Sequence, residues 1–326
     1  MDVAVVGAGS WGTALALVLA RNGHEVGLYG RESETLTALK SCRENLRYLP
    51  GFVLPDNCEI HELTEDAVPA PIAVLAVPTT AVEEVLPAVK GSEIVCIASK
   101  GLVQATSNLL SQLVGSVLPD ARLVALSGPN LARELAQGIP TAAVAASSDA
   151  EAAEAVRNRF MSRNYRVYLS DDITGVELAG AMKNVMAIAA GMSDGLGFGN
   201  NTKGALLARG LNEMARLGEA IGARRETFMG LAGVGDLFAT AASDLSRNNR
   251  VGYGLGKGRA LSAVLDEIGQ VAEGVQTSQI AVGMARSLQV DAPITQVVDA
   301  VVRGQMAARD AVVALMERAP TKETIT

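Results

Sequence analysis

Three glycines near the start of the chain constrain its fold more than any other feature. Gly7, Gly9 and Gly12 form the pattern G-x-G-x-x-G directly after an apolar run at residues 3–6, and a helix-favouring stretch follows at 13–20. In such a strand-turn-helix unit, the first glycine permits a tight turn, the second lets a pyrophosphate approach the backbone, and the third lets helix and strand pack closely. The helix N-terminus offers amides and a positive dipole end to that anion. The chain is therefore predicted to begin with a dinucleotide-binding unit.

The first half of the chain alternates short apolar runs with helical stretches. Runs that suit strands cover residues 3–6, 25–29, 72–77, 94–98, 123–126, 142–145 and 166–169. Such runs are typical of strands buried on both faces of a parallel sheet, with crossover helices between them. We predict an α/β protein whose residues 1–170 form a doubly wound, mainly parallel Rossmann domain. From residue 171, Ala-, Leu- and Met-rich segments at helical period predict a C-terminal all-helical domain, 171–326.

Composition narrows the class of ligand and the compartment. With 49% hydrophobic residues, 3% aromatic residues and a net charge of −7, the chain is globular and lacks the basic stripe of a nucleic-acid binder. The apolar stretch 3–20 has no leading positive charge and is interrupted by glycines, which argues against a signal peptide or a membrane span. Three cysteines without C-x-x-C spacing fit a reducing cytosol and no metal site. We expect a soluble, cytoplasmic protein with a small-molecule ligand, no nucleic acid and no membrane insertion.

Lys183 is the only charged residue between Glu177 and Asp194, within a run apolar enough to be a buried helix. An ammonium on an apolar face is desolvated, which lowers its pKa and suits it to proton exchange near neutral pH. The alternative is a lysine that reaches the surface or pairs with a carboxylate. Because the chain has only two histidines, lysine or a carboxylate is the better candidate for proton transfer.

The end of the second predicted strand bears on cofactor choice. An NAD-specific site usually places an acidic residue there, whereas this chain has Gly30, Arg31 and Glu32. Gly30 leaves room and Arg31 could pair with a 2′-phosphate, so NADP is favoured, while Glu32 keeps NAD open. The alternative for Arg31 is an exposed charge on a loop.

Further polar residues follow other predicted strands or interrupt the helical half. Lys100 and the loop at 127–130 come at carboxyl ends of strands, where ligands bind in open α/β sheets. Asp236 lies in a glycine-bracketed turn, and Arg247 with Asn248 forms a pair suited to a phosphate or a planar carboxylate. Such Arg-Asn pairs also commonly cap helices or face solvent.

Taken together, these motifs resemble one family closely, the bacterial NAD(P)-dependent glycerol-3-phosphate dehydrogenases. The resemblance covers nearly the whole chain and is carried by segments at 7–16, 45–55, 99–101, 127–147, 177–222, 230–250 and 271–277. It implies a hydride transfer between NAD(P)H and dihydroxyacetone phosphate that gives sn-glycerol 3-phosphate for phospholipid synthesis. It also implies that Lys183 is the general acid/base at the substrate C2 oxygen.

The resemblance also implies two sets of binding residues. Those expected to contact the substrate are Lys100, Gly128, Asn130, Lys183, Asn184, Asp236, Thr240, Ser246, Arg247 and Asn248. Those expected to contact the cofactor are Gly7, Gly9, Ser10, Trp11, Gly12, Arg31, Lys100, Ala132, Arg247, Val271 and Glu273. Asn130 departs from the Ser or Thr usual in the family, which predicts an altered substrate affinity.

Two rival functions and the oligomeric state stay open at this point. One rival is a reductase of the same architecture that acts on a hydroxy acid or keto acid, and segment 45–55 with the Ser246-Arg247-Asn248 tripeptide argues against it. The other is a catalytically silent dinucleotide sensor, which would have no need of Lys183 in an apolar run. The Ala- and Gly-rich helical half could support a homodimer, but a monomer core would show the same periodicity.

Overall fold

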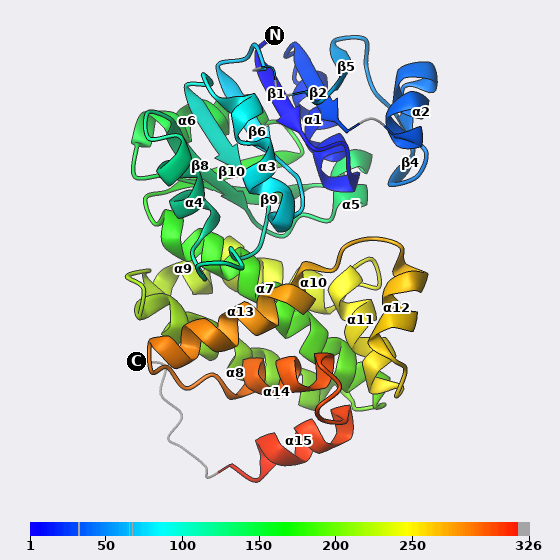
Figure 1. The fold of residues 1–326 in the computed structure, drawn as a ribbon, viewed down its shortest axis with the longest axis vertical. Helices are drawn as coiled ribbons and strands as arrows, with labels where there is room; N and C mark the ends of the chain where they lie inside the picture. Colours follow the sequence, from blue (N-terminus) through cyan, green and yellow to red (C-terminus); the bar gives the residue numbers. More distant parts are fainter. Residues whose placement is uncertain (32, 65, 67, 319–326) are drawn as a thin grey trace. The chain divides into compact units, whose positions relative to one another are not determined.

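The structure is a computed structural model that describes residues 1–31, 33–64, 66 and 68–318. Two compact units make up the chain (Figure 1). The first comprises Met1–Val103 and Asn108–Glu177, and the second comprises Gln104–Ser107 and the residues from Leu178 onward. This division falls inside helix α7 (Ile173–Gly195). The domain boundary after residue 170 stays a prediction.

An eight-stranded sheet forms the centre of the first unit, in the order β10-β9-β8-β7-β6-β1-β2-β5. Its neighbouring strands are parallel except β8 and β9, which are antiparallel. The strands are β1 (Val3–Val6), β2 (Val26–Gly30), β5 (Cys58–Glu62), β6 (Ile72–Leu75), β7 (Ile94–Ile97), β8 (Arg122–Ser127), β9 (Thr141–Ala146) and β10 (Tyr165–Ser170). The order reverses at β1, which lies between β2 and β6.

Both faces of the central strands of this sheet are buried, as the apolar runs predict, whereas on edge strand β10 the side chains of Tyr168 and Leu169 are exposed. Val3 and Val5 of β1 belong to one hydrophobic cluster, together with residues of α1, α5 and α6. Ala4 and Val6 belong to a second cluster, together with residues of α3 and α4. The helices are α1 (Ser10–Arg21), α2 (Glu34–Cys42), α3 (Val82–Val85), α4 (Leu110–Val117), α5 (Ala132–Gln137) and α6 (Ala150–Phe160). The predicted doubly wound, mainly parallel domain is confirmed.

Three strands of the first unit have no counterpart among the predicted runs. β5 forms one edge of the sheet, and its sequence Cys-Glu-Ile-His-Glu is too polar to resemble a buried strand. β3 (Glu44–Asn45) and β4 (Leu49–Val53) form a separate two-stranded antiparallel hairpin. Short, partly exposed strands carry little of the apolar signal on which the prediction depends.

Within its described residues, the second unit has only helices as regular elements, as predicted. After α7 they are α8 (Asn200–Glu219), α9 (Arg225–Met229), α10 (Asp236–Ala241), α11 (Arg247–Gly256), α12 (Leu261–Ile268), α13 (Glu273–Ser287), α14 (Pro293–Val302) and α15 (Ala308–Met316). By length and composition α7 could cross a membrane, but 83% of its most apolar stretch is buried inside the structure. The core helix of a soluble protein has these same properties.

Glycines bring α7 and α11 into unusually close contact. A Cβ atom at Gly252 of α11 would lie 1.9 Å from the Ile188 carbonyl oxygen of α7, and one at Gly191 of α7 would lie 2.0 Å from the Asn249 carbonyl oxygen of α11. Only residues without a side chain permit this backbone approach. The contact fixes α11, which carries Arg247 and Asn248, against the helix that carries Lys183.

Candidate active site

The three glycines of the first motif have the three local environments that the motif predicts. Gly7 has φ of 121°, and a Cβ there would lie 2.5 Å from the Ala76 carbonyl oxygen. Gly12 is packed so tightly that a Cβ would lie 1.8 Å from the Gly7 carbonyl oxygen. Gly9, in contrast, has nothing within 4 Å of its Cβ position. The loop is therefore closed on its packed side and open at Gly9, as an approaching pyrophosphate requires.

Residues next to this loop are held in defined positions. Ser10 begins α1, and the indole Nε1 of Trp11 donates a hydrogen bond to the Ala98 carbonyl oxygen at 3.0 Å. That bond joins the start of α1 to the residue after β7. Ala132 is the first residue of α5 and packs against the core cluster.

At the end of β2, Gly30 and Arg31 differ in their surroundings. A Cβ at Gly30 would lie 2.8 Å from the Ala8 side chain, so glycine is needed for packing beside the loop. The Arg31 side chain is 71% exposed, and its guanidinium lies 3.9 Å from the Glu84 carboxylate. An exposed ion pair at that distance is weak, which leaves the guanidinium accessible to an anion. Glu32, which was expected to keep NAD open, lies outside the described residues.

Lys100 and the loop after β8 meet in the first unit. The Lys100 ammonium donates to the Gly128 carbonyl oxygen at 3.1 Å, and Gly128 has φ of 147°. The Asn130 amide donates to the Ala142 carbonyl oxygen at 3.0 Å and accepts from the Tyr165 hydroxyl at 3.1 Å. Asn130 thus has structural partners on β9 and β10, which are contacts that the sequence did not predict.

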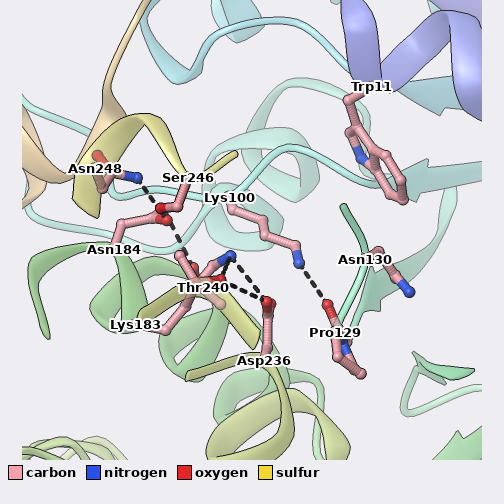
Figure 2. A network of polar contacts seen from close by, with 12 residues as sticks. Trp11, Lys100, Pro129, Asn130, Lys183, Asn184, Asp236, Thr240, Ser246 and Asn248 are labelled. Carbon is pink, nitrogen blue, oxygen red and sulfur yellow. Dashed lines mark hydrogen bonds and ion pairs between the residues drawn. The ribbon is translucent and has the colours of Figure 1, made fainter. Parts of the chain in front are cut away.

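In the second unit, Lys183 is buried together with a carboxylate and a hydroxyl. Its ammonium lies 2.8 Å from Asp236 Oδ1 and 2.7 Å from Thr240 Oγ1, and the Thr240 hydroxyl lies 3.1 Å from the same Asp236 oxygen. Asp236 is 1% exposed and Lys183 is 7% exposed. Figure 2 shows the three side chains pointing toward one another. Lys183 is therefore paired with a carboxylate, which was the alternative given above, and this carboxylate stabilises the ammonium form of the lysine against the cost of burial.

Asp236 owes its position to an irregular turn rather than to a regular helix. Leu231–Gly235 form a π-helical turn directly before α10, and Asp236 is the first residue of α10. A Cβ at Gly233 would lie 2.0 Å from the Phe228 carbonyl oxygen, so this turn requires glycine. Single π-helical turns occur frequently at functional sites.

A chain of amide hydrogen bonds links three helices beside Lys183. The Asn248 amide donates to Asn184 Oδ1 at 2.9 Å, and Asn248 Oδ1 accepts from the Gly274 backbone amide at 3.0 Å. The pair Asn184 and Asn248 is visible in Figure 2. These hydrogen bonds fix the start of α11 and the first turn of α13 relative to α7.

The remaining predicted residues of the second unit have more varied environments. Ser246 is the N-cap of α11, because its hydroxyl accepts from the Asn249 amide at 3.2 Å. Burial lowers the pKa of the Arg247 guanidinium, and the Glu273 carboxylate opposes that shift. Glu273 is the first residue of α13, and Val271 is 52% exposed before it.

One buried polar contact of the glycine loop was not predicted from the sequence. The Asn45 side chain is fully buried and hydrogen-bonded to the backbone of the glycine loop at Ala8. Among the described residues, no group of three or more His, Cys, Asp or Glu side chains is placed to hold a metal ion.

The fold and the glycine loop define the class to which the chain belongs. A doubly wound sheet with this loop after its first strand is typical of proteins that bind dinucleotides, and many of these are oxidoreductases. A family model described as NAD-dependent glycerol-3-phosphate dehydrogenase N-terminus matches residues 2–153, and its C-terminal counterpart matches residues 172–313.

Individual relatives agree with these matches over the full chain. The protein is 47% identical to the glycerol-3-phosphate dehydrogenase [NAD(P)+] of Trichlorobacter lovleyi and 46% identical to that of Geobacter metallireducens, with 98% of both chains covered in each case. The crystal structure of glycerol-3-phosphate dehydrogenase from Coxiella burnetii superposes with a TM-score of 0.93 at 37% identity, covering 97% of this chain and 99% of that one. The chain belongs to the NAD(P)-dependent glycerol-3-phosphate dehydrogenase family.

Proposed function

We propose that this protein reduces dihydroxyacetone phosphate to sn-glycerol 3-phosphate in the cytoplasm, for phospholipid synthesis. The observation that carries the proposal is the buried cluster of Lys183, Asp236 and Thr240 in a chain of this family. A protonated lysine held by a carboxylate is a proton donor placed in a largely dry environment. In a dinucleotide sensor without catalysis, this lysine would serve only the stability of the fold.

Lys183 acts as the general acid of the reduction. When bound, the reduced nicotinamide supplies the hydride that the substrate carbon C2 accepts. The Lys183 ammonium gives its proton to the C2 oxygen as negative charge develops there, and the resulting amine regains a proton from solvent. In the oxidation direction the same amine takes the proton back.

Asp236 and Thr240 hold the lysine in one orientation and stabilise its charged form. Their two contacts, 2.8 Å and 2.7 Å from the ammonium nitrogen, fix the directions in which the Lys183 ammonium points. This arrangement is the positioning that acid catalysis requires.

Arg247 and Asn248 recognise the phosphate end of the substrate, with Ser246, Asn184, Lys100, Gly128 and Asn130 as further substrate contacts. A guanidinium presents paired donors that match a phosphate. The Asn248 and Asn184 amides are held by the bonds described above, so little ordering remains for substrate to impose.

The glycine loop with Ser10 and Trp11 binds the cofactor, aided by Lys100, Ala132, Arg247, Val271 and Glu273. The exposed Arg31 guanidinium favours NADPH, because it could pair with the 2′-phosphate. The helical unit is also compatible with a homodimer, which sedimentation would test.

The proposal is tested by initial rates of reduced-nicotinamide oxidation with dihydroxyacetone phosphate, unphosphorylated dihydroxyacetone and a 2-keto acid. Turnover is expected with the phosphate ester and faster with NADPH than with NADH. Arg247→Gln should lower kcat/KM for dihydroxyacetone phosphate about 10- to 100-fold, the worth of a hydrogen bond to a charged group. At saturating NADPH, which offsets the loss of the proposed Arg247–cofactor contact, the same change should leave the slow reaction of dihydroxyacetone nearly unaltered. Faster turnover of the keto acid would instead support the rival reductase.

A further inference from the structure

The side chain of Asn45 is joined to the glycine loop from its packed side. Its amide nitrogen donates to the Ala8 carbonyl oxygen at 3.0 Å and to Thr13 Oγ1 at 2.8 Å. Its amide oxygen accepts from the Tyr48 backbone amide at 3.0 Å. Because Ala8 offers a carbonyl and Tyr48 an N–H, the orientation of the amide is fixed by its partners. Asn45 and Thr13 are both 0% exposed.

The bond to Ala8 determines which way the next backbone amide points. In a trans peptide, the carbonyl and the following N–H are coplanar and directed to opposite sides. The Ala8 carbonyl points toward Asn45, so the Gly9 N–H points away from it. The same residue, Gly9, has open space at its Cβ position. An anion that approached Gly9 would meet this N–H together with the N-terminus of α1.

Asn45 is itself held by a rigid support. It belongs to the hairpin of β3 and β4, which follows directly after Arg43. The Arg43 guanidinium donates to the Leu54 carbonyl oxygen at 2.9 Å and to the Cys58 carbonyl oxygen at 2.8 Å. These bonds connect both sides of the hairpin to edge strand β5. The amide of Asn45 therefore has little freedom to follow the loop if the loop moves.

We propose that Asn45 is a positioning residue for the dinucleotide: by holding the Ala8 carbonyl and the Thr13 hydroxyl, it keeps the Gly9 amide aimed at the cofactor pyrophosphate. This inference rests on the proposal that the glycine loop binds the cofactor. Asn45 acts through the backbone, so its removal alters cofactor affinity more than the affinity for substrate. Burial alone would give a loss of stability without that selectivity.

The chain offers a matched control in Asn57. Its side-chain amide also donates two hydrogen bonds, in this case to the backbone carbonyls of Ala20 at 2.9 Å and His24 at 2.8 Å, at the opposite end of α1. Asn45→Ala and Asn57→Ala remove the same kind of group from the same unit. Binding of NADPH would be measured by quenching of Trp11, the only tryptophan of the chain. Circular dichroism would establish that each variant is folded at the assay temperature.

Asn45→Ala is expected to raise the dissociation constant for NADPH about tenfold, the effect of one lost hydrogen bond to a buried carbonyl. Its KM for dihydroxyacetone phosphate at saturating cofactor should stay within about twofold, since the loss acts on cofactor binding alone. Asn57→Ala should lower the thermal midpoint yet leave the dissociation constant within about twofold, because its contacts lie far from the loop.

If Asn45→Ala does not fold, Thr13→Val replaces it, with Thr13→Ser as the control that keeps the hydroxyl. Thr13→Val should weaken NADPH binding and Thr13→Ser should not. The inference would be overturned if folded Asn45→Ala bound NADPH as tightly as the wild type, or if Thr13→Val bound it as tightly as Thr13→Ser. It would also be overturned if Asn57→Ala weakened NADPH binding as much as Asn45→Ala does. A wild-type protein that does not bind NADPH or NADH would instead refute the proposed cofactor site itself.

Discussion

Replacing Lys183 by methionine separates its proposed catalytic role from its structural one. Methionine keeps most of the side-chain length but has neither charge nor donor. Loss of a general acid should lower kcat about 10²- to 10⁴-fold. If Lys183 contributed only packing or folding, the activity per folded molecule would be almost unchanged.

The structure also predicts the stability of this variant. Asp236 is 1% exposed and loses a partner 2.8 Å away, while it keeps the Thr240 hydroxyl at 3.1 Å. Removal of one member of a buried ion pair costs about 3–5 kcal/mol, because the remaining buried carboxylate loses the ammonium that balances its charge. For a unit of this size the thermal midpoint should fall by about 10 °C.

A second substitution tests the reasoning. Asp236→Asn added to Lys183→Met removes the buried negative charge, so it should restore most of the lost stability and none of the activity. The assay combines thermal unfolding by circular dichroism with turnover of dihydroxyacetone phosphate at a temperature where all variants are folded. A double variant that regained near-normal turnover would refute the acid role of Lys183. If Lys183→Met alone were as stable as the wild type, the stabilising role of the buried ion pair would be contradicted.

Three further predictions concern the loop, a buried carboxyl group and a helix cap. Gly9→Ala should leave the stability of the cofactor-free protein nearly unchanged but weaken NADPH binding. Gly12→Ala should instead destabilise the fold, since a Cβ there would lie 1.8 Å from a carbonyl oxygen. Thermal unfolding and titration with NADPH distinguish the two variants. Burial raises the pKa of Glu177 from its ordinary 4.5 to about 7. Its contribution to the free energy of unfolding is therefore complete below pH 4.5 and is lost as pH rises through about 7, a decrease of about 3 kcal/mol. Glu177→Gln should remove this pH-dependent decrease. Parallel curves of stability against pH for the variant and the wild type would refute the prediction. The Glu213 carboxylate accepts hydrogen bonds from the backbone amides of Ile294 and Thr295, in the first turn of α14, at 2.9 and 2.8 Å. Glu213→Ala should therefore lower the free energy of unfolding by about 1–3 kcal/mol and leave KM for dihydroxyacetone phosphate unchanged. Equal denaturant midpoints for the variant and the wild type would contradict this.

The fold class could be predicted because it depends on signals that are local in sequence. The glycine pattern follows an apolar run and opens a helix, so one short segment identifies the strand-turn-helix unit. The buried strands are apolar on both faces and are recognisable without knowledge of their partners. β5 and the β3–β4 hairpin were missed because edge strands and short hairpins are partly exposed and carry mixed polarity.

Partners of the candidate site residues were harder to predict, because they lie far apart in sequence. Lys183 and Asp236 are 53 residues apart, and nothing local in either segment identifies the other. The family resemblance predicted that Lys183 and Asp236 belong to one site, whereas helical periodicity alone predicted only apolar neighbours for Lys183. Asn45 begins segment 45–55, which contributes to the family resemblance, but its contact could not be predicted, because that contact depends on a hairpin packed against a loop 37 residues earlier. Asn130 similarly acquires partners on two strands that its own loop does not reveal.

Transfer of a labelled hydride tests the central claim most directly. The protein would be incubated with dihydroxyacetone phosphate and NADPH deuterated at the transferable position of the nicotinamide, and the product would be analysed by mass spectrometry and proton NMR. The account predicts sn-glycerol 3-phosphate with one deuterium at C2. Absence of this product under conditions where the cofactor binds, or a product without deuterium at C2, would contradict it.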